Sequence, residues 1–198
     1  MLMRTPMKAA LAAALLSVGL AAQAGTKTVP LVDTPGPGGI FGYNGFDVFV
    51  EQKVAARFSV PDTGDHRLVR VGIWFMNNSD TEQRTVNVSV QTDALDEGGS
   101  ESLPSGRRLE AWSAPVATVG WNPVEQFFTT VKGPRLKAGQ NYWVVAASKS
   151  PPFVDPVWTF AKNGNMVTTT TYQGAWQTAG SGAALTLRVD AHPVAPLN

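Results

Sequence analysis

The chain has 198 residues, with 16 Lys and Arg against 15 Asp and Glu, and it contains no cysteine. The lack of thiols excludes disulfides, zinc sites built on cysteine, and thiol catalysis. The nearly balanced charge, without a basic run, argues against nucleic acids and anionic membrane surfaces as partners.

The first 24 residues have the order of a secretory signal peptide. Arg4 and Lys8 precede an apolar run over residues 9–22, and Ala22-Gln23-Ala24 supplies the small residues of a cleavage site. The run of 14 residues is shorter than the roughly 20 that a membrane-spanning helix needs. We therefore expect cleavage after Ala24 and a secreted or periplasmic protein with no transmembrane segment. One mature domain over residues 25–198 is expected, with 14 basic and 15 acidic residues.

After the leader, apolar residues alternate at a period of two and never recur at helical spacing over three turns. The clearest strands are Val69 to Met76, Val86 to Gln91 and Leu185 to Asp190. In the first, the odd-numbered residues form an apolar core face; the other two are expected to keep one face in water. Less regular strands are expected at residues 46–58, 109–114, 124–131, 142–147, 157–161 and 166–172.

Turn-forming clusters of Gly, Pro, Asn and Asp separate these strands. Among them, Asn163-Gly164 has the residues of a tight primed turn, and it predicts a hairpin between strands 157–161 and 166–172. About nine short strands at such spacing predict an all-β fold. We expect an antiparallel β-sandwich, most simply a jelly roll.

Several short motifs follow one another in an order similar to that of a family of bacterial exported proteins. They are LVDTPGPGG (31–39), VAARFSVP (54–61), RLVRV (67–71), VNVSVQTD (86–93), LEAW (109–112) and LKAGQNYWVV (136–145). This order resembles the choice-of-anchor R domain, in which an L-x-A-G-x-x-Y-W-x-V strand entry follows an L-E-x-W element. The resemblance implies an extracellular β-sandwich without an established reaction or ligand. The family's usual C-terminal sorting signal is not found here, which favours plain secretion.

Candidate catalytic residues are few. The only histidines, His66 and His192, lie in a turn and in the C-terminal segment, and no nucleophile elbow or phosphate loop is present. Glu51, Glu110 and Glu125 lie in or beside predicted strands, where carboxylates about 5 to 10 Å apart could hydrolyse glycosides. Solvent-facing acids on half-exposed strands have the same pattern. We expect a protein that is not an enzyme, with a glycan-active hydrolase as the less favoured alternative.

A Gly-rich acidic loop over residues 93–101 is a candidate metal site. Its carboxylates, above all those of Asp93, Asp96 and Glu97, are the hard oxygen ligands that calcium takes. The spacing is not that of an EF-hand, and a solvated loop has the same composition. The turn over residues 62–65 is a weaker alternative, because Asp is common at turns for backbone reasons alone. Calcium is the one cofactor that the sequence suggests.

Six tryptophans are the most informative excess in the composition. An exposed aromatic ring can stack on the apolar face of a sugar, but tryptophan more often fills a core. We expect Trp143 to be buried, because its strand is apolar on both faces. Trp121, beside Asn122, and Trp176, after Gly174-Ala175, lie in loop-like contexts and are the candidates for ligand contact.

These observations favour a secreted, non-enzymatic β-sandwich that acts in binding or adhesion. Its expected partner is a polysaccharide, or a protein, of the cell surface or matrix. The alternative is a structural or assembly component of an extracellular matrix that recognises protein partners through its edge strands.

Overall fold

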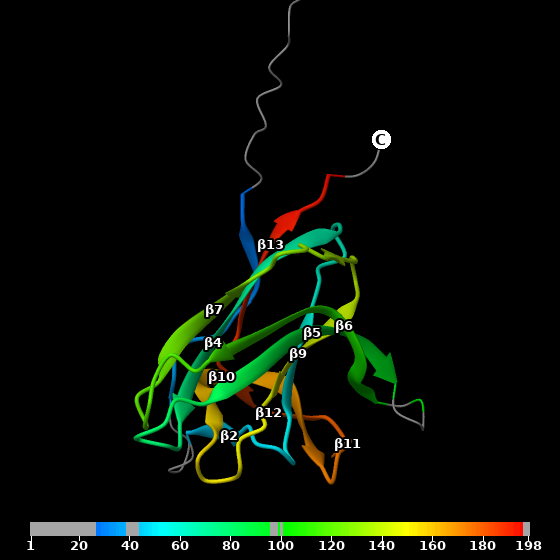
Figure 1. Cartoon of the computed structure of the whole chain (residues 1–198). Coiled ribbons are helices and arrows are strands. Elements are labelled where there is room, and N and C mark those ends of the chain that lie inside the picture. The colour runs from blue at the N-terminus through cyan, green and yellow to red at the C-terminus, as the bar shows by residue number, and fades with distance from the viewer. Residues whose placement is uncertain (1–26, 39–43, 96–98, 100, 196–198) are drawn as a thin grey trace, which may run out of the picture.

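The computed structural model describes residues 27–38, 44–95, 99 and 101–195, and every regular element in these ranges is a β-strand. Antiparallel pairing connects the thirteen strands, and they form the two layers of a sandwich (Figure 1). The predicted fold class, an all-β antiparallel sandwich, is confirmed. No helix in the described part of the chain is long and apolar enough to cross a membrane.

The strands divide between the layers by their pairing. The first layer contains β1 (Val29–Asp33), β2 (Gly45–Asp47), β4 (His66–Asn77), β7 (Val124–Thr129), β8 (Arg135–Leu136), β13 (Arg188–Pro193) and the first part of β10 (Pro156–Tyr172). The second contains β3 (Val54–Ser59), β5 (Thr85–Leu95), β6 (Ser102–Pro115), β9 (Asn141–Ala147), β12 (Gly180–Leu185) and the later part of β10. β11 (Ala175–Trp176) pairs with the end of β10.

β10 passes from one layer to the other, and this overturns the predicted hairpin at Asn163-Gly164. Both residues lie inside β10, where the stretch from Phe160 to Asn165 faces only the stretch from Leu185 to Ala183. The extra residues form an irregularity that bends the strand. Gly164 has a φ of 109°, so the pair does supply the positive φ that predicted a turn. Here that freedom redirects a continuing strand instead of reversing the chain.

The main core lies between the layers and is built mostly from aliphatic residues of alternating strands. Val86, Val88 and Val90 are buried there as predicted. On β4 the predicted face is wrong at one end: Val69 is only half-buried, and Leu68 lies in the core. A register shift between Asp190 and Ala191 of β13 leaves Val69 without a partner on β13 and moves the inward face to Leu68.

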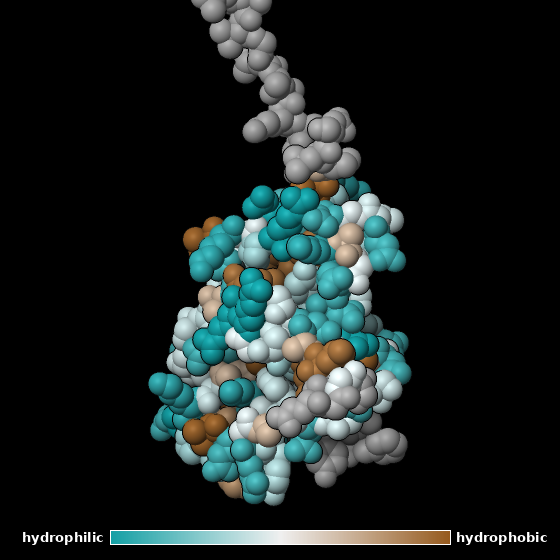
Figure 2. Space-filling view, turned by 90° about the vertical axis from the view of Figure 1, so that its right-hand side faces the viewer, coloured by the Kyte–Doolittle hydropathy of each residue, from teal (hydrophilic) through white to brown (hydrophobic). Residues whose placement is uncertain are grey.

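The predicted water-facing side of residues 185–190 is also wrong. Thr186 and Asp190 are fully buried, while Arg188 between them is half-buried. Thr186 Oγ1 donates to the carbonyl of Thr159 at 3.1 Å, and Asp190 accepts from Arg70 Nε at 2.6 Å. These partners satisfy the buried polar groups, which would otherwise destabilise the fold. Figure 2 shows one face of the molecule, on which apolar side chains form small separate groups among hydrophilic ones.

Candidate functional site

Three rows of side chains cross the outer face of the second layer, which is the face turned away from the main core. Each row takes one residue from neighbouring strands: Arg108–Gln91–Trp143–Arg57, Ala111–Ser89–Val145–Ala55, and Ser113–Asn87–Ala147, in the order β6, β5, β9 and, for the first two, β3. The middle row has short side chains, whereas the rows beside it carry amides, charges and an indole. Because side chains on one face of a sheet stand side by side, the short row leaves a trough.

This trough is a groove of about 580 Å³, which we call the outer groove. Its lining consists of Lys53, Asn87, Val88, Ser89, Gln91, Gly106, Arg108, Ala111, Trp112, Ser113, Val145, Ala147, Ser148, Lys149 and Trp176. The residues come from β5, β6, β9 and β11 and from the segments next to β3 and β9, so the groove depends on long-range strand pairing. Its floor is the polar half of the alternation that places Val86, Val88 and Val90 in the core.

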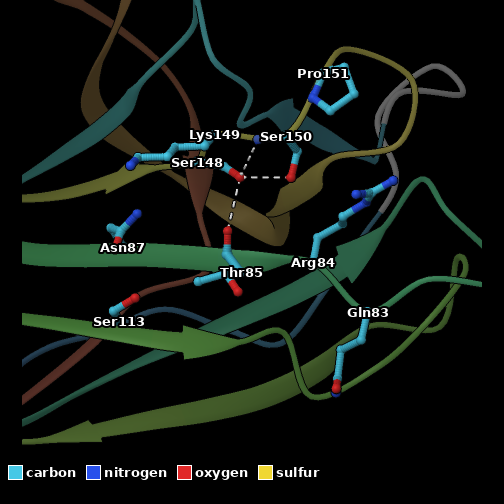
Figure 3. Close-up of a pocket in the computed structure, with 9 residues that line it drawn as sticks. All are labelled: Gln83, Arg84, Thr85, Asn87, Ser113, Ser148, Lys149, Ser150 and Pro151. Carbon is cyan, nitrogen blue, oxygen red and sulfur yellow. Dashed lines mark hydrogen bonds between the residues drawn. The ribbon is translucent and has the colours of Figure 1, made fainter.

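A second hollow of about 460 Å³ continues the outer groove toward Arg84. The two hollows share four lining residues: Asn87, Ser113, Ser148 and Lys149. Ser148 Oγ lies 2.9 Å from the Thr85 carbonyl oxygen and 2.9 Å from Ser150 Oγ, and it is hydrogen-bonded to each (Figure 3). Those bonds hold the loop after β9 against the start of β5, and they fix the wall of the hollow.

Trp176 closes the side of the outer groove nearest β3. Its ring packs on a small second apolar cluster of Ala55, Trp143 and Val145, on the outer face of the sheet. Trp176 is half-buried, and the part that is not packed lines the groove. Trp143 is fully buried in this cluster, as predicted, but the cluster is separate from the main core. One of the two predicted ligand-contact tryptophans thus lies at a formed site.

Some polar groups of the outer groove are held by the protein and others remain open to a ligand. Gln91 is fixed, because its Nε2 donates to Ser89 Oγ at 3.0 Å and its Oε1 accepts from the Gly106 N–H at 3.0 Å. Asn87 and Ser113 lie opposite each other and are exposed. Neither side chain has a hydrogen bond to another described residue. An amide and a hydroxyl are therefore free to bind polar groups of a ligand.

Trp121 lies in a different hollow, of about 370 Å³. It is 61% exposed, and it lines this hollow with Asp47, Asn78 and Phe153. No lining residue is shared with the outer groove. The structure therefore does not combine Trp121 and Trp176 into one binding surface.

Asp47, which lines the hollow beside Trp121, lies close to a second carboxylate, that of Asp155. Asn78 Nδ2 donates to Asp47 Oδ1 at 3.1 Å and approaches Asp155 Oδ1 at 3.4 Å. Asp155 is fully buried, and its Oδ2 has no hydrogen-bond partner. Burial, followed by the nearby charge of Asp47, raises the pKa of Asp155 above its usual range. Asp155 itself does not line the hollow, so its raised pKa bears on stability and not on a ligand.

The structure describes only part of the acidic loop over residues 93–101. Asp93 Oδ1 accepts from Trp143 Nε1 at 2.6 Å and from Ser102 Oγ, so this carboxylate has a structural function. Asp96 and Glu97 lie outside the described residues. Within the described ranges, no three His, Cys, Asp or Glu side chains are grouped so that they could hold a metal ion. Calcium binding at Asp93, Asp96 and Glu97 stays a prediction.

The three glutamates considered for glycoside hydrolysis have different surroundings. Glu110 is buried, and its Oε2 accepts from Thr130 Oγ1 at 2.6 Å and from the Lys132 N–H at 3.1 Å. Glu125 of β7 lies opposite Trp74 of β4, and Glu51 is exposed in the turn before β3. Glu110 therefore stabilises the turn after β7.

Asn87 and Ser113 were not singled out from the sequence, although a signal for them exists. The outward residues of β5, Asn87, Ser89 and Gln91, are all neutral hydrogen-bonding types, and this run of polar residues without a charge is the signal. Comparison with known proteins gives no further guide, because no protein-family model and no curated protein matches this chain.

Proposed function

We propose that this protein is a secreted, non-enzymatic β-sandwich that binds a polysaccharide chain in the outer groove. The observation that carries the proposal is the combination in one groove of a tryptophan edge with free amide and hydroxyl groups, at Trp176, Asn87 and Ser113. Sugars present apolar C–H faces and a ring of hydroxyls, so an aromatic side chain and neutral polar groups are the partners they need. Because the groove is open at the molecular surface, it can hold an internal stretch of a polysaccharide as well as the end of one.

The location of the groove supports a polymer as ligand. It crosses the strands of β6, β5 and β9, and neighbouring strands lie about 4.8 Å apart. The adjoining hollow extends it past Ser148 toward Arg84 (Figure 3). An elongated site of this kind contacts several units of a chain, and contacts with several units add to the affinity.

The test measures binding with variants that leave the fold intact. Affinity gel electrophoresis against a panel of soluble polysaccharides identifies a binder, and intrinsic tryptophan fluorescence then gives its affinity. The double substitution Asn87→Ala, Ser113→Ala should weaken binding about tenfold, as expected for two lost hydrogen bonds of about 0.7 kcal/mol each. Because both side chains are exposed and unpaired, the melting temperature should not change.

Trp176→Ala should also abolish most of the binding, but it removes packing from Ala55 and Val145 and will lower stability. Trp121→Ala is the matched control, since Trp121 lies in the other hollow. If Trp121→Ala loses binding and the Asn87→Ala, Ser113→Ala variant keeps it, the binding site is the hollow beside Asp47 and not the outer groove. Absence of binding to every polysaccharide would contradict the proposal.

One structural observation favours the alternative of an assembly component. β6 has 14 residues and lies at the end of the sheet, where β5 is its one partner among the described strands. An open edge strand of this length can pair with a strand of another chain. Under this alternative the protein associates in a concentration-dependent way, and it responds to no polysaccharide. Analytical ultracentrifugation distinguishes the two functions.

Export is part of the proposal and is tested separately. The sequence pattern of residues 1–24 predicts that the mature chain begins at Gly25. Expression of the full-length chain in a bacterial host, followed by mass determination of the protein released from the periplasm, checks the cleavage site. An intact Met1 terminus on cell-associated protein would contradict it.

A further inference from the structure

The charged residues along the outer groove and its extension all have the same sign. Lys53, Arg84, Arg108 and Lys149 line the outer groove or the second hollow that continues it, and among the described residues no Asp or Glu lines either hollow. Yet the whole chain has almost as many acidic as basic residues. From this charge pattern, and resting on the proposed polysaccharide function, we infer that the groove binds an acidic polysaccharide, whose sugars carry carboxylate groups.

Three of these cations have no counter-ion in the described part of the protein. The ion pairs between described residues use Arg70, Arg84, Arg135 and Arg188 as cations. Lys53, Arg108 and Lys149 are not in this group, and none of them has an interaction left undescribed. Positive side chains that are left unpaired in a concave site attract anions to it. The groove therefore supplies charge that a neutral chain would leave unused.

The unpaired cations lie on both sides of the short central row. Arg108 lies opposite Gln91, in the row on one side. Lys53 precedes β3 and Lys149 follows β9, so both lie near Ala147, at the end of the row on the other side. A polysaccharide lying over Ser89 would thus have cations along both of its edges. The guanidinium of Arg108 can hold a carboxylate through two parallel hydrogen bonds, and each lysine through one strong one.

Arg84 provides a further positive charge at the far end of the second hollow. Its Nη2 pairs with Glu82 Oε2 at 2.6 Å, whereas its Nε is buried and has no hydrogen-bond partner. In Figure 3, Arg84 and Lys149 lie at opposite ends of the drawn group, with Ser148 between them. The extension thus has a cation at each end and hydroxyl groups in the middle.

The small number of unpaired cations and of available aromatic rings favours a carboxylated sugar chain over a nucleic acid. A nucleic-acid strand carries a phosphate about every 3.4 Å, and proteins that bind single strands combine a dense basic track with several stacking aromatic rings. Two half-buried indoles line the outer groove, but Trp112 packs on the main core, which leaves Trp176 as the ring on its outer side. Of the three unpaired cations, Lys53 and Lys149 lie at one end of the groove, and Arg108 lies across the neutral polar floor from them. Such a site lacks the dense basic track that a nucleic-acid strand needs.

The experiment compares acidic polysaccharides with their own neutral forms. Polygalacturonate, alginate and hyaluronate are each tested beside a preparation whose carboxyl groups have been reduced to alcohols, with poly(dT) as a polyanion of another class. We expect binding to at least one acidic chain that is at least tenfold tighter than to its reduced form. The binding should also weaken as salt rises from about 0.05 to 0.5 M, because salt screens exposed charges.

Substitutions then assign this preference to the groove. Arg108→Gln with Lys149→Gln should weaken binding of the acidic chain about tenfold and weaken binding of its reduced form much less. Lys132→Gln with Lys162→Gln removes the same net charge from exposed side chains that line neither hollow, and it should have little effect. An equal loss in both variants would contradict a role for the groove cations.

The outcomes separate this inference from the proposed function. Equal affinity for an acidic chain and its reduced form, without salt dependence, would overturn the inference and keep polysaccharide binding. Tighter binding to poly(dT) than to every acidic polysaccharide would overturn it in favour of a nucleic acid. Failure to bind any of the polymers would overturn both.

Discussion

The indole Nε1 of Trp143 donates a 2.6 Å hydrogen bond to Oδ1 of Asp93. Trp143 is fully buried, and buried donors need an acceptor. We predict that Asp93→Ala lowers the free energy of unfolding by about 1–3 kcal/mol, because the indole N–H then remains buried without a partner. Asp93→Asn keeps an acceptor oxygen and should cost less. Urea denaturation of the three proteins measures the difference.

The same variant separates a structural role of Asp93 from calcium binding. Loss of the hydrogen bond to Trp143 predicts the same destabilisation in EDTA and in excess calcium. A calcium site at Asp93, Asp96 and Glu97 predicts a different result. EDTA should then lower the melting temperature of the unmodified protein and have no effect on that of Asp93→Ala. An unmodified protein whose melting temperature is the same in EDTA and in calcium would remove the calcium hypothesis.

β5 shows what local pattern alone can predict. Val86, Val88 and Val90 all lie in the core, because a strand paired on both sides keeps the alternation that its sequence dictates. The groove floor of Asn87, Ser89 and Gln91 is the other half of that alternation. What the pattern misses is that Ser89 and Gln91 are buried. Their burial depends on neighbours from β6, β9 and β11, far away in the chain.

Residue type predicts the local backbone conformation better than it predicts the path that the chain then takes. The Asn163-Gly164 pair does provide a positive φ, at Gly164, but the chain continues into the other layer because β10 pairs with β2 and β4 before this point and with β3 after it. Similarly, Trp176 was singled out from its loop-like context. Its partners Ala55 and Val145 are brought to it only by strand pairing. Contacts of this kind have no signal at short sequence separation.

Gly45 tests the close pairing of β2 with β10. A Cβ atom at this position would lie 2.1 Å from the carbonyl oxygen of Trp158, a backbone atom that cannot rotate away. Gly45→Ala should therefore force β2 from β10 and lower the free energy of unfolding by about 1–3 kcal/mol. Gly36→Ala is the control, since no described residue apart from its chain neighbours has an atom within 4 Å of the position that its Cβ would take, and it should change stability by less than about 0.5 kcal/mol. Equal melting temperatures of the two variants would contradict the close contact.

Asp155 predicts a pH-dependent term in the stability. Burial and the charge of Asp47 raise the pKa of Asp155, so the folded chain holds this proton at pH values where the unfolded chain has lost it. Stability from this group is therefore greatest at low pH and falls as the pH rises from about 3.9, the usual aspartate pKa, through the raised value. Asp155→Asn has no charge at any pH and lacks this term.

The melting temperature of Asp155→Asn, minus that of the unmodified protein, should thus be more positive at pH 7 than at about pH 4. Asp65 has the opposite sign: its hydrogen bonds from the Ala138 N–H and from Arg135 lower its pKa, and its stabilisation is lost as the pH falls. Because both proteins contain Asp65, its effect cancels in the difference. Asp47→Asn removes the smaller of the two causes and should give a weaker change of the same direction. A difference that does not vary with pH would show that Asp155 is ionised at its ordinary pKa despite its burial.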